Sequence, residues 1–169
     1  MALADLITGF SAWAQQFVGA YGYLGIFLVS FIGSASIILP VPSFIIVFTF
    51  GSILNPWLVG IAGGVGSAIG ELTAYAIGRG GKKALEKSHG KLLKKTHDWV
   101  KKRGLFAVLI LFAATPLPDD LAGVFAGVIH YDIRKMFLAT LIGKLVLNLA
   151  LAWGGFYGMQ WVLSYLGGI

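Results

Sequence analysis

The chain carries no charged side chain in the 65 residues between Asp5 and Glu71. A straight helix of that length would measure roughly 100 Å, whereas the hydrocarbon core of a bilayer is about 30 Å thick. The uncharged run must therefore fold back on itself. Hydrophobic residues make up 57% of the chain and charged residues only 12%, about half the charged share of an ordinary soluble domain. We predict an all-α integral membrane protein, with a single membrane domain over residues 1–169.

Two Pro-x-Pro pairs interrupt segments that otherwise read as membrane-embedded chain. They are Pro40 with Pro42 and, 76 residues later, Pro116 with Pro118. Proline removes a backbone donor and ends a helix. In lipid, the backbone groups freed at each break must therefore form hydrogen bonds with other protein or with water that lines a cavity. Paired breaks of this kind point to a transport site between two inverted repeats.

The repeat extends beyond the prolines. Gly51 matches Gly127 at the same offset, and after one inserted residue Gly66 and Gly78 match Gly143 and Gly155. We predict two repeats, over about residues 33–79 and 105–157, each a re-entrant broken helix followed by a spanning helix. We also predict an earlier span that includes Tyr21–Ile32, with an interfacial helix or the start of that span over Leu3–Val18.

Positive charge is concentrated between the two repeats. Ten Lys or Arg side chains and only two acidic ones lie from Arg79 to Arg103, in a chain whose formal net charge is +6. Short basic loops stay in the cytoplasm, so residues 80–104 are predicted to form a cytoplasmic loop. Its leucine spacing predicts an amphipathic helix. We interpret this segment as a topology determinant that is also attracted to lipid headgroups, and we expect no nucleic acid partner.

The basic loop fixes the orientation of both repeats. A span over about Pro56–Gly78 leads into the loop, so the broken segment Gly33–Asn55 enters and leaves from the outside. Two basic residues follow the second broken segment, Leu105–Ile129, and place its ends on the cytoplasmic side. A span over about Leu138–Tyr157 then runs outward, and Gln160–Ile169 ends at the outer side. The repeats are thus predicted to have opposite orientations.

Four ionisable residues lie inside the predicted membrane segments: Glu71, Asp119, Asp120 and Lys144. Each costs at least ~2.5 to 3.5 kcal/mol to insert, so such residues are functional candidates. Glu71 and Lys144 lie at similar depths, about 12 Å and about 13 to 14 Å from the cytoplasmic edge, which makes them candidate partners. Alternatively, this pair only fixes helix register, and Asp119 only caps a helix that starts at Asp120. Asn148 corresponds to Glu71 in the second repeat.

Three segments resemble signature motifs of the VTT-domain superfamily. They are Gly66-Ser-Ala-Ile-Gly-Glu-Leu-x-x-Tyr75, Asp120-Leu-Ala-Gly-x-x-x-Gly127 and Phe137-x-Ala-Thr-Leu-Ile-Gly-Lys144. This superfamily includes the bacterial and archaeal DedA proteins, SNARE-associated Golgi protein-like proteins and the eukaryotic vacuole membrane protein, whose branch the chain resembles most. The resemblance covers about Gly33–Trp153.

The resemblance implies two re-entrant segments in inverted repeat and the movement of lipid between leaflets. Eukaryotic members scramble phospholipid, and prokaryotic members transport phosphorylated carrier lipid or phospholipid. By motif position it implies functional roles for Glu71, Lys144 and the acids after Pro118, and we add Tyr75 and Asn148 to the predicted lipid path. We expect a multi-pass protein of a prokaryotic plasma membrane.

We therefore predict a lipid scramblase or flippase whose path is a groove between two re-entrant helices, with membrane lipids as its partners. The alternative is a secondary transporter coupled to protons or to a cation bound by the same acids. The carboxylates lack a recognisable metal-ligand spacing, so we expect neither an enzyme nor a metal or other cofactor. The sequence leaves the oligomeric state open, a homo-oligomer included.

Overall fold

The computed structural model describes residues 9, 12–13, 16–36, 43–81, 104–115 and 120–166. Its elements in these ranges are helices: α2 (Tyr23–Ala35), α3 (Ser43–Gly51), α4 (Pro56–Gly70), α6 (Leu105–Ala113), α7 (Asp120–Val128) and α8 (Ile133–Leu166). Helical backbone continues beyond α4 over residues 72–81, because Glu71 N donates to Ser67 O and Tyr75 N donates to Glu71 O. The all-α prediction is confirmed for this part of the chain.

Two helices are long and apolar enough to cross a membrane. They cover Pro56–Gly81, with 26 residues, and Ile133–Trp161, with 29 residues. At 1.5 Å per residue they are about 39 and 44 Å long, more than the thickness of the hydrocarbon core. Large apolar side chains on these helices are exposed, among them Trp57, Leu58, Ile61, Ile77, Leu138, Ile142 and Val146. Such a surface suits lipid better than water.

Both spanning helices begin at a side-chain cap. Asn55 Oδ1 accepts a hydrogen bond from Trp57 N at 3.0 Å, and Asp132 Oδ1 accepts one from Arg134 N at 2.8 Å. Each cap satisfies a backbone donor that the first turn of a helix leaves free. The two capping residues are 77 positions apart, the same offset that relates Gly78 to Gly155.

Helices end and restart on either side of each proline pair. α2 ends at Ala35 and α3 begins at Ser43, and α6 ends at Ala113 and α7 begins at Asp120. These interruptions confirm the predicted breaks, whereas the prolines themselves, in 37–42 and 116–119, lie outside the described residues. The four helices have 13, 9, 9 and 9 residues and are about 14 to 20 Å long, so none crosses a bilayer alone.

Two helix boundaries differ from the sequence expectation. Tyr21–Ile32 does not form a span of its own, because Gly22 has a φ of 57° and separates the preceding helical residues from the 13-residue α2. α2 is instead the helix before the first break, as α6 is before the second. The second span is longer than Leu138–Tyr157, since no proline or charge interrupts the 34-residue α8 after Lys144. Most of Leu3–Val18 and the helix predicted for the basic loop lie outside the described residues.

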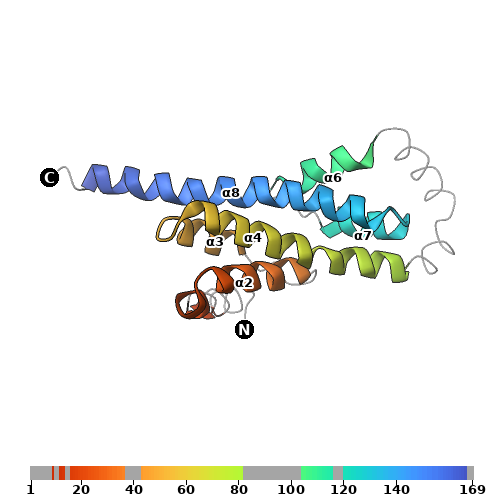
Figure 1. The fold of residues 1–169 in the computed structure, drawn as a ribbon, viewed down its shortest axis with the longest axis horizontal. Helices are drawn as coiled ribbons and strands as arrows, with labels where there is room; N and C mark the ends of the chain where they lie inside the picture. The colour runs from red at the N-terminus through yellow and green to blue at the C-terminus, as the bar shows by residue number, and fades with distance from the viewer. Residues whose placement is uncertain are drawn as a thin grey trace.

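α4 and α8 pack against each other in antiparallel orientation at the centre of the molecule. Gly60 lies against Leu149 and Gly64 against Leu145, so the numbering falls along α8 as it rises along α4. A Cβ at Gly64 would lie only 2.9 Å from Leu145 Cα, and glycine permits this close approach. Figure 1 shows α2 along the side of α4 that faces away from α8.

The second helix of each interrupted pair packs on the spanning helix of the other half. α3 lies on α8, and α7 lies on residues 71–81. Close backbone contacts mark both places: Gly51 with Ala152 O, Gly155 with Phe48 O, Gly127 with Tyr75 O and Gly78 with Val124 O. Adding 76 to the numbers of the α3 residues and subtracting 77 from the numbers of the α8 residues turns the first two contacts into the last two. The glycine spacing in the sequence therefore corresponds to matched contacts.

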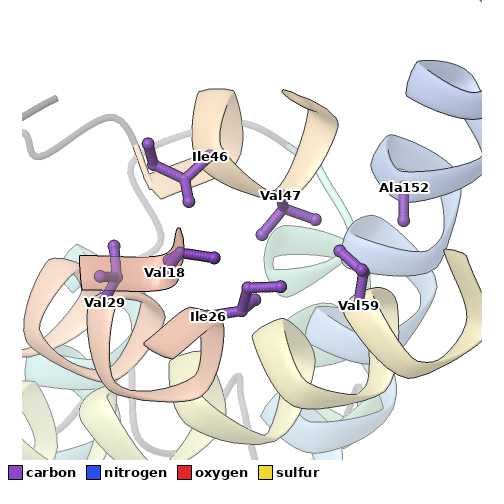
Figure 2. Close-up of a cluster of buried hydrophobic side chains, with 7 residues drawn as sticks. All are labelled: Val18, Ile26, Val29, Ile46, Val47, Val59 and Ala152. Carbon is purple, nitrogen blue, oxygen red and sulfur yellow. The ribbon is translucent and has the colours of Figure 1, made fainter. Parts of the chain in front are cut away.

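Two apolar clusters lie toward opposite ends of the α4–α8 pair. One consists of Val18, Ile26, Val29, Ile46, Val47, Val59 and Ala152, whose side chains Figure 2 shows in a common interior. The other consists of Tyr75, Leu105, Leu109, Ala126, Met136 and Ala139. In a bilayer, such clusters are stabilised by close packing more than by transfer from water. Between them lies a group of buried polar residues.

Candidate functional site

Four polar side chains are buried in the middle of the molecule: Ser67 and Glu71 on α4 and its continuation, and Lys144 and Asn148 on α8. We call them the polar layer. Their exposed fractions are 4%, 1%, 8% and 5%. On each helix the two residues are four positions apart and so share a face. Glu71 lies about 22 Å along the helix from Pro56 and about 15 Å from Gly81, which places the layer near mid-depth of that span.

Glu71 and Lys144 form an ion pair. Lys144 Nζ lies 3.8 Å from Glu71 Oε2. This contact confirms the pairing that their similar depth predicts. Beside it, Asn148 Nδ2 donates to Lys144 O at 2.8 Å, while a Cβ on Gly63 of α4 would lie 2.8 Å from Asn148 Oδ1. Charged and amide groups thus meet where the surrounding helices are otherwise apolar.

The carboxylate of Glu71 also faces the first turn of α7. A Cβ at Gly123 would lie 2.6 Å from Glu71 Oε1 and 3.1 Å from the Cβ of Ala74. Gly123 is the fourth residue of α7, and the first turn of a helix favours a nearby negative charge. Glu71 therefore lies between the ammonium of Lys144 on α8 and the start of α7. One side chain connects three helices.

Asp120 is the first residue of α7 and is half-buried. It precedes Gly123 by three positions, so both lie on the same side of the helix. The start of α7, which follows the second proline pair, therefore lies close to the polar layer. Asp119 and Pro118 lie outside the described residues, and the capping role considered for Asp119 stays a prediction.

Tyr75 is buried one turn beyond Glu71, but its hydroxyl lies at the α7–α8 connection. Tyr75 Oη donates to Tyr131 O at 2.6 Å and accepts from Arg79 Nη1 at 3.1 Å. The connection is itself tightly turned, because His130 has a φ of 54° and Tyr131 N donates to Ala126 O at 2.9 Å. In this structure Tyr75 fixes a corner of the fold. Its place in the motif gave no indication of this contact.

Three buried polar residues were not identified from the sequence: Ser30, Ser67 and Thr140. Ser67 could have been found, because it is 77 positions before Lys144 and so occupies the equivalent place in the first half. Thr140 Oγ1 lies 3.1 Å from the carbonyl oxygens of Met136 and Phe137 in its own helix. Ser30 Oγ has no hydrogen-bond partner among the described residues.

Outside the spans, the N-cap of α8 is an electrostatically stabilised carboxylate. The backbone N–H of Lys135 is the main cause that lowers the pKa of Asp132, and the N–H of Arg134 and both basic side chains add to it. Burial and the nearby Asp132 raise the pKa of Tyr131. Because the pKa of Asp132 is lower in the folded than in the unfolded chain, the ionised cap stabilises the fold at pH values above the ordinary pKa of about 3.9. This stabilisation is lost as the pH falls through the pKa of Asp132 in the folded chain.

Comparison with known proteins identifies similar sequences. The profile of the VTT domain matches residues 41–157. The uncharacterized membrane protein YbfM of Bacillus subtilis is 30% identical over 141 residues, covering 76% of this chain and 85% of that protein. The vacuole membrane protein KMS2 of Arabidopsis thaliana is 37% identical over 103 residues, covering 50% of this chain and 24% of that protein. The chain thus matches about a quarter of KMS2. No solved structure matches it.

Proposed function

We propose that this chain, which belongs to the VTT domain family of membrane proteins, moves lipids between the two leaflets of its membrane. The observation that carries the proposal is the polar layer, with a charged pair, between two antiparallel spanning helices. A lipid headgroup is polar and its tails are not. Crossing therefore requires polar partners at the depth where hydrocarbon otherwise excludes the headgroup.

We further propose that the two halves, α2 to α4 and α6 to α8, are inverted repeats and that the two interrupted pairs are re-entrant hairpins. Two observations support this. The spanning helices are antiparallel, and the close contacts of α3 on α8 match those of α7 on residues 71–81 at constant offsets. Inverted repeats with broken helices place a substrate site at the midplane between them. The position of Glu71, about 22 Å from one end and about 15 Å from the other end of the Pro56–Gly81 span, supports such a site.

The polar layer is buried, so passage requires at least one hairpin helix to move away from the span beneath it. Lys144 would then attract the phosphate of a headgroup, and Glu71 would attract a headgroup ammonium. Asp120 at the start of α7, with Asp119 beside it in sequence, would hydrate the entrance. No covalent bond is made or broken in such a cycle.

The proposal is tested by reconstitution. Purified protein is placed in liposomes that contain a fluorescent phospholipid, and a membrane-impermeant quencher reports the lipid in the outer leaflet. We expect exchange without any ion gradient, faster than in protein-free liposomes. The buried acid–base pair would also serve a coupled transporter. Exchange or ion flux that occurs only under a proton or cation gradient would favour that alternative.

A further inference from the structure

Two contacts between the halves cover opposite sides of the polar layer. α3 lies beside Asn148, because a Cβ at Gly63 would lie 2.9 Å from Val47 Cγ2 and 2.8 Å from Asn148 Oδ1. α7 lies beside Glu71, through the contact at Gly123. We call these regions the α3 contact, where α3 packs on α8, and the α7 contact, where α7 packs on residues 71–81.

Both contacts are made in the same way. In each, one glycine of the hairpin helix and one glycine of the span lie against carbonyl oxygens of the other helix. Such backbone packing depends on dispersion and weak C–H···O contacts, which are individually small. Neither set of glycines therefore favours opening at one contact over the other.

A tyrosine hydroxyl distinguishes the two contacts. At the α7 contact, Tyr75 donates to Tyr131 O across the boundary between the halves and accepts from Arg79. The position equivalent to Tyr75 at the α3 contact is Ala152, whose methyl group makes no hydrogen bond. The corner before α4 does contact a tyrosine, because Asn55 N donates to Tyr23 Oη at 3.3 Å. Tyr23 belongs to α2, so that bond lies within one half.

We infer that Tyr75 is a latch that holds the α7 contact closed and that the α3 contact opens more readily. The latch lies at Arg79 and at the start of α8, which carries Arg134 and Lys135, and the basic segment follows Arg79 in the sequence. The significance of this difference in opening between the two contacts rests on the proposed function, because the contact that opens more readily would decide from which side a headgroup first reaches the polar layer. The opening itself can be measured without lipid exchange.

The experiment uses single cysteines, because the chain has none of its own. Ala152 is fully buried beneath α3, and Ala74 is fully buried beneath α7. Ala152→Cys and Ala74→Cys are each combined with native tyrosines, with Tyr75→Phe, and with Tyr23→Phe as the matched control. Labelling by a small maleimide is measured in liposomes and normalised to labelling of the same variant unfolded in detergent.

We expect Ala152→Cys to label faster than Ala74→Cys when the tyrosines are native. Tyr75→Phe should accelerate labelling of Ala74→Cys by about two- to twelvefold, the effect of one hydrogen bond on an opening equilibrium. It should leave Ala152→Cys unchanged, and Tyr23→Phe should not accelerate Ala74→Cys. An unchanged rate at Ala74→Cys, equal acceleration at both cysteines, or the same effect from Tyr23→Phe would each overturn the latch.

A second measurement avoids the cysteines, in case either variant fails to fold. Hydrogen exchange of peptides from α3 and α7 is compared between the native chain and Tyr75→Phe. Faster exchange confined to α7 supports the latch, and unchanged or general acceleration contradicts it. If labelling behaves as expected but liposomes show no lipid exchange, the latch stands and the proposed function fails. If liposomes exchange lipid but Tyr75→Phe leaves labelling unaltered, the proposed function stands and the latch fails.

Discussion

At the scale of single residues, Glu71 connects the fold to the proposed function. Its carboxylate lies 3.8 Å from the ammonium of Lys144 and against the first turn of α7 at Gly123. The pairing with Lys144 could be predicted, because depth along a helix follows from counting residues. The contact with Gly123 could not be predicted, because it depends on how α7 lies across residues 71–81. The same is true of the hydrogen bond from Tyr75 to Tyr131.

Breaking the ion pair should cost more than removing it altogether. Glu71→Gln and Lys144→Met should each lower the free energy of unfolding by about 3 to 5 kcal/mol, because each removes one partner of a buried ion pair. The double variant should lose clearly less than the sum of the two. Thermal unfolding of the four proteins in one detergent gives the double-mutant cycle. Strict additivity would show that the two side chains do not interact.

Gly123 should tolerate no side chain. The Cβ in Gly123→Ala would lie 2.6 Å from Glu71 Oε1 and should displace a carboxylate that Lys144 holds in place. Overpacking of this kind costs about 1 to 3 kcal/mol of stability. Gly80→Ala is the matched control, since Gly80 is also helical and its Cβ would meet nothing within 4 Å. Equal unfolding temperatures for the two variants would argue against the tight contact at Gly123.

At the scale of elements, the positions of prolines and charges predicted the helix boundaries well, whereas hydrophobicity predicted them poorly. Both breaks and the first span follow from residues that a helix in lipid cannot accommodate easily. The role of α2 could not be read in this way, because every residue from Tyr21 to Ile32 is uncharged and suits a span. A left-handed Gly22 shortens that helix, and apolar composition alone does not reveal it.

Substitutions at the start of α7 distinguish a role in the lipid path from simple helix capping. Asn is as good an N-cap as Asp, so Asp119→Asn with Asp120→Asn should leave folding almost unchanged. If the two carboxylates hydrate the entrance to the polar layer, the same double variant should exchange lipid at least about tenfold more slowly, a barrier increase of about 1.4 kcal/mol. Size-exclusion behaviour reports folding. A folded variant with undiminished exchange would remove both acids from the mechanism.

At the scale of the whole molecule, orientation in the membrane follows from the basic segment. We expect residues 80–104 to be cytoplasmic and the end of α8 to be outside. Ser88→Cys in the loop and Ser164→Cys on exposed α8 should therefore react with an impermeant reagent from opposite sides. Labelling of intact cells, before and after lysis, makes the comparison. Reaction of Ser88→Cys in intact cells would show that the orientation is the opposite of the predicted one.

The central claim is that lipid crosses the membrane at the polar layer. Leaflet exchange in liposomes should be measured for the native chain, for Glu71→Gln with Lys144→Met, and for Val146→Leu, whose side chain is 54% exposed on α8. We expect fast exchange by the native chain and by Val146→Leu. The double variant should be at least about tenfold slower although folded, because its layer lacks both charges. Native-like exchange by the double variant, or a native chain no faster than protein-free liposomes, would contradict the account.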